Sequence, residues 1–320
     1  MRDILKVFFY LFRKRKNDII PDKVDDNPTA IFPQFSFVPQ KGNRFTLETA
    51  EWLTAVCNNA FNLHTGRAKE YLKGINSVTE LFWHNELFIT DQDTMCGYMG
   101  KIEGVDGALV IVIRGTDSLA EWYADGLFEQ REMNFTGTKI VGRIEKGFSD
   151  LYTQPAVTRG KVKVGSLREQ ILGAIKNRYK ETQVVYITGH SLGAGIATLL
   201  AADLSVAYPK LSLITYTFAS PRVGDPDFTH TFQKYIDSRK AFFTLYRVYN
   251  ISDVVPTLPF PAMDGTVYEH TQSNVLEDSL EPGKNYMGGI GIESNQGTTV
   301  KNHVLCTYIA AMNNYQDTCH

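Results

Sequence analysis

The chain has 320 residues, of which 43% are hydrophobic and 21% are charged, and its formal net charge is −2. A chain of this size can bury a large core, and it suffices for one α/β domain with an extension. The near-neutral charge gives no field that would attract nucleic acid, so a nucleic-acid partner is not expected. The four cysteines contain no C-x-x-C pair, so they indicate neither a zinc site nor a disulfide scaffold. Reduced thiols are the default expectation, although the count is compatible with one or two bridges.

The first 44 residues differ in character from the rest of the chain. Met1 opens a short apolar run that is closed by four basic residues ending at Lys16, and residues 17–44 contain four prolines and clustered aspartates. The run is far shorter than the ~20 residues of a transmembrane helix, and no small-residue cleavage site follows it. Residues 1–16 are therefore either the start of the fold or a segment that lies on an anionic membrane. We expect an extension over 1–44, a domain over 45–320, and a cytoplasmic protein with peripheral membrane association.

Apolar spacing predicts the first elements of the domain. Residues 45–73 carry apolar side chains at helical intervals, which favours a helix. Residues 94–102 are predicted as a strand. The β-branched run at 109–113 is typical of a strand that is buried on both faces of a parallel sheet, and it leads directly to Thr116.

The next stretch, residues 117–126, is predicted as a short helix. Ser118 and Glu121 have the S-x-x-E spacing of a capping box, and Gly126 supplies a C-terminal stop. One face of this helix carries its apolar residues, Leu119, Trp122 and Tyr123. We expect the helix to be a lid over the site. The alternative is an ordinary surface helix whose apolar face packs permanently on the core.

The middle of the chain is predicted as strand, tight turn and helix. An apolar run at 184–188 leads into the sequence G-H-S-L-G at 189–193, and helical spacing then continues until Pro209. In this context G-x-S-x-G predicts a nucleophile elbow, in which Ser191 has a strained backbone and an exposed hydroxyl. The flanking glycines would let the strand and the helix approach closely without a clash of Cβ atoms.

Two further apolar runs, at 212–218 and 245–251, continue a pattern of strands that alternate with helices. This alternation predicts an α/β fold with a mostly parallel, doubly wound sheet and helices on both faces. In such sheets, active sites form beyond the carboxyl ends of the strands. Thr116, Ser191 and Asp253 each follow a predicted strand, so we expect them to lie near one another.

A serine hydroxyl is a weak nucleophile, and it needs an imidazole base that is oriented by a carboxylate. In this architecture the chain order is serine, acid, histidine. Asp253 is the expected acid because it follows its strand directly, and Asp225 and Asp227 are the alternatives.

His303 is the expected base. It follows a glycine-rich segment and precedes an apolar helical pattern, so a rigid element would present it. His270 is the alternative and lies in an alternating stretch typical of a strand, while His320 is the last residue. His190 is expected to orient the turn, because its side chain must point away from that of Ser191.

A tetrahedral intermediate needs hydrogen-bond donors for its oxyanion. The backbone N–H of Leu192 supplies one donor, because this residue follows the nucleophile. We expect Thr116 to supply the second donor through its backbone N–H and its hydroxyl. The alternative is a turn threonine that caps its own loop.

Together these residues resemble the class 3 lipases, a family of α/β-hydrolases. The resemblance covers about residues 45–315 and rests on His303 and on four motifs: I-R-G-T at 113–116, G-H-S-L-G at 189–193, S-P-R-V-G at 220–224 and D-V-V-P at 253–256. It implies hydrolysis of acylglycerol lipids through an acyl-enzyme, with no metal or organic cofactor, and a lid helix that bears a tryptophan. One departure is Glu145, where the family commonly has a histidine.

The lipid class stays open at this point. Acylglycerols and phospholipids are both compatible with the resemblance, so a phospholipase A1 or a soluble esterase of the same fold is an alternative. A function of another class would be a catalytically silent module that binds lipid surfaces. The serine, acid and histidine in the expected order argue against that alternative, since binding alone would not require them.

Overall fold

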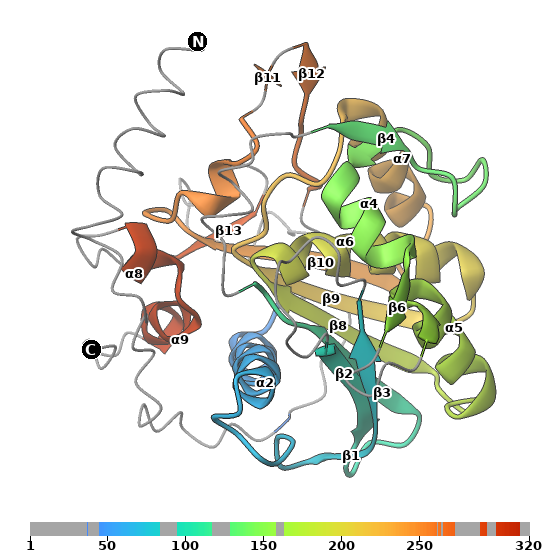
Figure 1. Ribbon diagram of the computed structural model, residues 1–320, viewed down its shortest axis with the longest axis vertical. Helices are drawn as coiled ribbons and strands as arrows, with labels where there is room; N and C mark the ends of the chain where they lie inside the picture. The colour runs from blue at the N-terminus through green and yellow to red at the C-terminus, as the bar shows by residue number, and fades with distance from the viewer. Residues whose placement is uncertain are drawn as a thin grey trace.

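The fold is built on a central sheet of seven strands in the order β1-β2-β3-β8-β9-β10-β13 (Figure 1). From β3 to β13 neighbouring strands run parallel, and β1 and β2 extend one edge as antiparallel strands. The computed structural model describes residues 37, 45–83, 95–116, 129–157, 163–260, 262–263, 265–272, 289–292 and 299–313. The strands of the sheet are β1 (Ile75–Phe82), β2 (Met95–Ile102), β3 (Ala108–Ile113), β8 (Val184–His190), β9 (Ser212–Phe218), β10 (Phe243–Asn250) and β13 (Ile290–Ile292).

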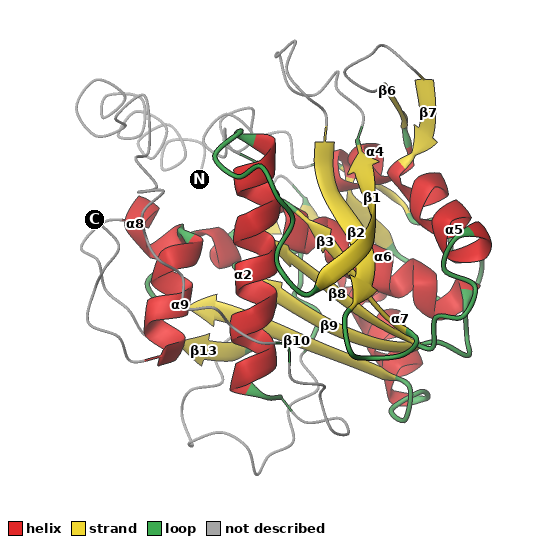
Figure 2. Cartoon of the chain, turned by 90° about the horizontal axis from the view of Figure 1, so that it is seen from below, coloured by secondary structure: helices red, strands yellow, loops and turns green. Residues whose placement is uncertain are grey.

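Helices cover both faces of the sheet (Figure 2). One face packs against α2 (Leu47–His64) and α9 (Leu305–Asn313), and the other against α4 (Lys146–Thr153), α5 (Leu167–Asn177), α6 (Leu192–Ala207) and α7 (Pro226–Asp237). The described ranges also contain the short helices η2 (Val255–Thr257) and α8 (Thr299–His303) and the two-stranded pairs β4 (Gln130–Glu132) with β5 (Arg143–Glu145), β6 (Pro155–Val157) with β7 (Lys163–Ser166), and β11 (Ala262–Met263) with β12 (Thr266–Val267). The predicted fold class is confirmed.

Strand β3 shows why the parallel strands are apolar without interruption. Leu109 and Ile111 belong to the core between the sheet and α4 to α7, whereas Val110 and Val112 belong to the core beneath α2 and α9. Successive side chains of a strand point to opposite faces, so both sets are withdrawn from water. All residues of β3 are buried.

Helix α6 begins where β8 ends and is buried along nearly its whole length, from Leu192 to Ser205. It contains one buried carboxylate, Asp203, which accepts hydrogen bonds from Arg168 Nε at 2.7 Å and from the Tyr152 hydroxyl at 2.9 Å. A buried charge is tolerated when it is paired in this way. The helix that follows the turn is therefore part of the core.

The structure differs from the sequence predictions at two elements. The helix expected over 45–73 is α2 and ends at His64, and the sequence predicts no strand at the position of β1. Strand β1 lies at the edge of the sheet, so several of its side chains face solvent, and a register shift between Asn76 and Thr79 interrupts its period. An exposed, bulged edge strand lacks the clean alternation that marks a strand in a sequence.

Cys57 and Cys96 are buried free thiols, and burial raises the pKa of Cys57 to about 12. Cys306 is disulfide-bonded. The expectation of reduced thiols is therefore wrong at Cys306, because sequence spacing does not reveal which cysteines meet in the fold.

Two predicted segments, the N-terminal residues 1–16 and the lid stretch 117–126, lie outside the described residues. Within the described part of the chain, no helix combines the length and the hydropathy that crossing a membrane requires.

Candidate active site

Two predicted site residues lie beyond the carboxyl ends of parallel strands of the central sheet. Ser191 follows β8, Asp253 follows β10 after a short turn, and β9 lies between these two strands. The register aligns His190 of β8 with Phe218 of β9, and Phe218 with Val248 of β10. The end of β8 is therefore level with Val248, two residues before β10 ends, and the residues after the two strands gather at one edge of the sheet.

Residues 189–193, which we call the elbow, form the turn between β8 and α6. Ser191 has φ 58° and ψ −127°, a backbone conformation that residues other than glycine rarely adopt. A Cβ atom at Gly189 would lie 2.3 Å from the Gly193 carbonyl oxygen, and one at Gly193 would lie 2.2 Å from that of Ile113. The Ser191 N–H also donates to the Phe218 carbonyl at 2.9 Å. Close backbone contact thus fixes the elbow, and both positions require glycine.

The Ser191 hydroxyl is buried, contrary to the exposed position that the sequence predicts. The residue is 2% exposed, and among the described residues its Oγ accepts and donates no hydrogen bond. The elbow lies between the end of β9, whose Phe218 carbonyl accepts the Ser191 N–H, and the loop after β3. A Cβ atom at Gly115 of that loop would lie 3.3 Å from the Ser191 Cβ.

Asp253 and His303 form a direct pair. His303 Nδ1 lies 2.8 Å from Asp253 Oδ2, and the two side chains are 13% and 0% exposed. The same oxygen accepts a hydrogen bond from the Tyr308 hydroxyl at 2.8 Å, while Oδ1 accepts one from the Val255 N–H at 2.9 Å. Both carboxylate oxygens are thus occupied, which fixes the plane of the carboxylate. Because Nδ1 faces Asp253, Nε2 is the ring nitrogen of His303 that remains for proton transfer.

Tyr308 contacts the predicted acid, and the sequence does not single it out. Its hydroxyl accepts the Asn250 N–H at 3.0 Å and donates to Asp253, so it connects the end of β10 to the carboxylate. Burial, followed by the neighbouring Asp253, raises the pKa of Tyr308 well above its usual range. The phenol therefore stays protonated and acts as a donor. In the sequence, Tyr308 fits the apolar helical spacing of α9, and nothing marks its hydroxyl as a hydrogen-bond donor.

The alternative acids and base have other partners. Asp225 caps α7 by accepting the Phe228 N–H at 2.8 Å, and Asp227 lies in the first turn of the same helix. His270 is buried with Nε2 2.6 Å from the Pro256 carbonyl oxygen, and burial, together with two arginines nearby, lowers its pKa well below the usual range.

His190 lies in the turn, and it also contacts His303. Its Nε2 lies 2.8 Å from the His303 carbonyl oxygen, and the two ring centroids are 4.7 Å apart. Burial of the ring, and secondarily His303, lowers the pKa of His190 well below its usual range, so the ring is neutral. Since a carbonyl oxygen only accepts, the proton of the neutral ring is on Nε2.

Of the two predicted oxyanion donors, Leu192 lies in the elbow and Thr116 lies in the loop beside it. Leu192 is the first residue of α6, and the first N–H groups of a helix have no partner within it. Thr116 follows Gly115, which packs against the elbow. A Cβ atom at Gly115 would lie 3.1 Å from the His190 carbonyl oxygen. The loop after β3 and the start of α6 therefore approach Ser191 from two sides.

Glu145 is part of the packing beside α6. Its buried carboxylate caps α4 by accepting the N–H groups of Gly147 at 2.9 Å and Phe148 at 2.7 Å. Burial raises the pKa of Glu145 to about 7, although these two donors oppose the shift. The ring of Phe148 lies against Gly195, where a Cβ atom would approach it to 2.8 Å. Glu145 thus supports the helix that packs on the first turn of α6.

The predicted lid residues, Leu119, Trp122 and Tyr123, lie outside the described residues. Across the described ranges, no group of three histidine, cysteine, aspartate or glutamate side chains could hold a metal ion.

The sequence matches a family model and several characterised relatives. The model for lipase (class 3) matches residues 110–263. A phospholipase A1-II 1 of Oryza sativa subsp. indica is 35% identical over 161 residues, which are 47% of this chain and 39% of the rice protein. A lipase of Rhizomucor miehei is 32% identical over 220 residues, which are 67% of this chain and 51% of the fungal protein. The chain thus spans about half or less of the length of these relatives.

Solved structures share the fold. The Lip2 lipase of Yarrowia lipolytica superimposes with a TM-score of 0.50 at 20% identity, covering 74% of this chain and 82% of that one. A lipase of Rhizopus microsporus var. chinensis gives a TM-score of 0.52 at 18% identity, covering 84% and 82%. At this identity the likeness concerns the α/β-hydrolase fold alone. The chain is thus similar to the class 3 lipases over residues 110–263, the part that carries Ser191 and Asp253.

Proposed function

We propose that this protein is a serine hydrolase that cleaves the carboxylic ester bonds of acylglycerol lipids through an acyl-enzyme. The observation that carries the proposal is the 2.8 Å contact between His303 Nδ1 and Asp253 Oδ2, at the sheet edge where Ser191 stands in a strained turn. An imidazole oriented by a carboxylate, beside a serine on an elbow, is suited to acyl transfer.

In the first half of the proposed reaction, Ser191 Oγ attacks the ester carbonyl and its proton passes to His303 Nε2. Asp253 keeps Nδ1 protonated and stabilises the imidazolium. The tetrahedral intermediate then collapses, the C–O bond to the alcohol breaks, and the alcohol leaves with the proton from His303. In the second half, His303 takes a proton from water, which attacks the acyl-enzyme and releases the fatty acid and the Ser191 hydroxyl.

The negative charge of each tetrahedral intermediate needs preorganised donors. We assign this role to the N–H of Leu192 and to Thr116, because the loops that carry them approach Ser191 from two sides. Donors fixed by a helix start and by a loop packed on the elbow need little reorganisation when the charge develops.

A fluorophosphonate probe tests the reaction class. Wild-type protein should be labelled once per chain, and Ser191→Ala should not be labelled and should lose at least about 10⁴-fold in kcat on a soluble ester. Ser220→Ala is the matched control, because Ser220 is also buried and follows the neighbouring strand, and its hydroxyl donates to the Pro221 carbonyl at 3.0 Å. An unlabelled wild-type protein would favour the catalytically silent lipid-binding module instead.

The rice relative favours a second candidate, phospholipase A1 activity at the same site. A panel of sn-1-labelled triacylglycerol, diacylglycerol and phosphatidylcholine would separate the candidates. We expect the acylglycerols to be hydrolysed fastest, and faster turnover of phosphatidylcholine would replace the acylglycerol proposal with phospholipase A1. Turnover of soluble esters without hydrolysis of any of the three lipids would indicate a soluble esterase.

Two further proposals concern segments outside the described residues. We propose that residues 117–126 form a lid whose face of Leu119, Trp122 and Tyr123 turns toward lipid, so that activity rises when the substrate forms an interface. We also propose that residues 1–16 associate peripherally with anionic membranes in the cytoplasm, at roughly 1 kcal/mol per basic residue near the surface. Deletion of 1–16 should weaken sedimentation with anionic vesicles, and unchanged binding would contradict the second proposal.

A further inference from the structure

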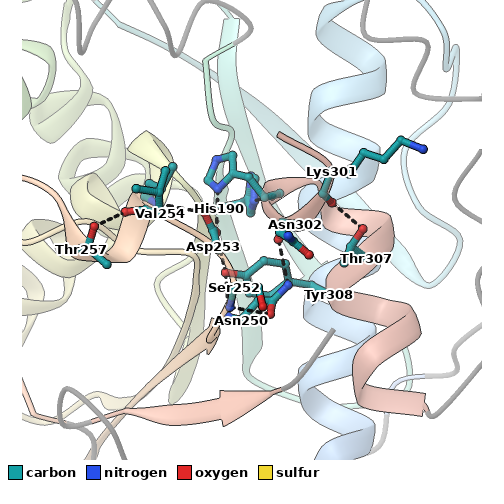
Figure 3. Close-up of polar contacts among 12 residues, drawn as sticks. His190, Asn250, Ser252, Asp253, Val254, Thr257, Lys301, Asn302, Thr307 and Tyr308 are labelled. Carbon is teal, nitrogen blue, oxygen red and sulfur yellow. Dashed lines mark hydrogen bonds and ion pairs between the residues drawn. The ribbon is translucent and has the colours of Figure 1, made fainter. Parts of the chain in front are cut away.

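The end of helix α8 is held by side chains. This helix has five residues and ends at His303, and the last carbonyl groups of a helix have no partner within it. Here the carbonyl oxygen of Lys301 accepts from Thr307 Oγ1 at 2.6 Å, that of Asn302 from Asn250 Nδ2 at 3.1 Å, and that of His303 from His190 Nε2 at 2.8 Å. Three successive carbonyls are thus each bound by a different side chain, and Figure 3 labels the three donors, His190, Asn250 and Thr307.

The three donors come from three different elements. His190 is the last residue of β8 and precedes Ser191, whereas Asn250 is the last residue of β10 and lies just before Asp253. Thr307 lies in α9, and like Asn250 it is fully buried. The main chain at His303 is therefore tied directly to the ends of the two strands that carry Ser191 and Asp253.

The contact to Asp253 alone would leave the position of His303 loosely defined. A single hydrogen bond at Nδ1 fixes one direction of the ring, while the main chain could still shift and carry Nε2 away from Ser191. Helices this short have little stability of their own, so the position of α8 depends on tertiary contacts. A displacement of 1 Å in a reacting group can cost about 100-fold in rate.

We propose that His190, Asn250 and Thr307 are positioning residues, which hold the main chain of His303 so that its ring stays paired with Asp253 at the sheet edge that carries Ser191. The inference rests on the proposed function, since it presupposes that His303 is the base of a serine hydrolase. The neutral state of His190 fits this role, because its Nε2 must keep a proton in order to donate to the carbonyl.

The sharpest test uses Thr307, because valine has nearly the same shape and lacks the hydroxyl. In Thr307→Val we expect kcat on a soluble ester and the rate of fluorophosphonate labelling to fall about tenfold, with KM within about twofold of wild type. Thr307→Ser keeps the donor and should recover at least half of the wild-type rate. Equal losses in the two variants would show that Thr307 acts only by packing and would overturn its positioning role.

His190 provides an independent pair of variants. His190→Phe keeps an aromatic ring beside His303 and removes the donor, so kcat should fall about 100-fold at unchanged KM. His190→Gln carries an amide N–H of similar reach and should recover part of this loss. If His190→Phe does not fold, as judged by its thermal melting, the Thr307 pair decides alone.

A failure of the positioning proposal can be distinguished from a failure of the proposed function. A wild-type protein that the probe does not label contradicts the proposed function. A labelled wild type whose Thr307→Val and His190→Phe variants react at the wild-type rate leaves the proposed function intact and contradicts the positioning role.

Discussion

The elbow and the base segment, residues 299–313, hold their functional side chains by different means. The elbow is fixed by backbone atoms in close contact, such as Gly193 against Ile113, and by a helix that belongs to the core. In the base segment α9 also packs in the core, but the main chain at His303 is held by single polar contacts, such as that of Asn250 with the Asn302 carbonyl, and Asp253 accepts a single hydrogen bond from Tyr308. The position of the proposed nucleophile is therefore a property of the whole fold, whereas that of the proposed base depends on a few side chains.

Substitution at the elbow should produce the largest effect. In Gly193→Ala the new Cβ would lie 2.2 Å from the Ile113 carbonyl oxygen, so we expect the free energy of unfolding to fall by more than about 3 kcal/mol. Gly173→Ala in α5 is the matched control, because a Cβ there meets no atom within 4 Å and alanine favours a helix by about 1 kcal/mol. Urea denaturation measures both. Equal stabilities would show that the elbow can relax.

The loop that faces the elbow should matter next. Thr116→Ala removes the hydroxyl and keeps the backbone donor, so kcat should fall about 100-fold with little change in KM. Thr116→Ser should restore most of the rate. Steady-state kinetics on a soluble ester measures the changes in kcat and KM separately. A defect confined to KM would assign Thr116 to substrate binding.

Glu145 gives the elbow side of the molecule a pH dependence. Burial raises its pKa from 4.5 to about 7, so the folded state favours the protonated form, and the associated stability is present below pH 4.5 and is lost as the pH rises through about 7. Relative to Glu145→Gln, wild type should lose on the order of 2 kcal/mol between pH 5 and 8. Glu169 has a lowered pKa, so Glu169→Gln should show a dependence of opposite sign. Parallel stability curves for wild type and Glu145→Gln would refute the shift.

The smallest effect is expected in the base segment. Tyr308→Phe removes one donor to Asp253 and leaves the Asn250 N–H without its acceptor, so kcat should fall about tenfold and the free energy of unfolding by about 1.5 kcal/mol. Tyr152→Phe is the matched control, because it removes a similar hydrogen bond to Asp203, which lies in α6 away from the sheet edge. It should lower stability by a similar amount and leave kcat unchanged. Equal kcat in the two variants would deny Tyr308 a role in orienting the acid.

The same difference decides what can be predicted from the sequence. The elbow is encoded locally: the strand, the glycines and the apolar helix are adjacent in the chain, so the fold class and the backbone strain at Ser191 follow from the pattern. Asp253 could be proposed because it follows an apolar run. The burial of Ser191 could not be predicted, because it depends on how the loop at Gly115 packs.

The contacts of the base segment carry no local signal. Tyr308 and Asn250 are distant in sequence, and a tyrosine at an apolar helical position does not reveal that its hydroxyl reaches a carboxylate. His190 could be expected to orient the turn, but its contact with the His303 carbonyl joins the ends of two separate elements. Such contacts follow from the tertiary fold, and only a structure supplies them.

The burial of α6 has a consequence for how the protein responds to heat. Amide protons of a helix enclosed in the core exchange with solvent only when the whole domain unfolds, whereas a helix of five residues such as α8 can open by itself. The proposed base should then be released at temperatures where the proposed nucleophile is still in place. Below the melting transition, warmed protein would keep its circular dichroism and lose its reactivity toward the probe, and cooling would restore it.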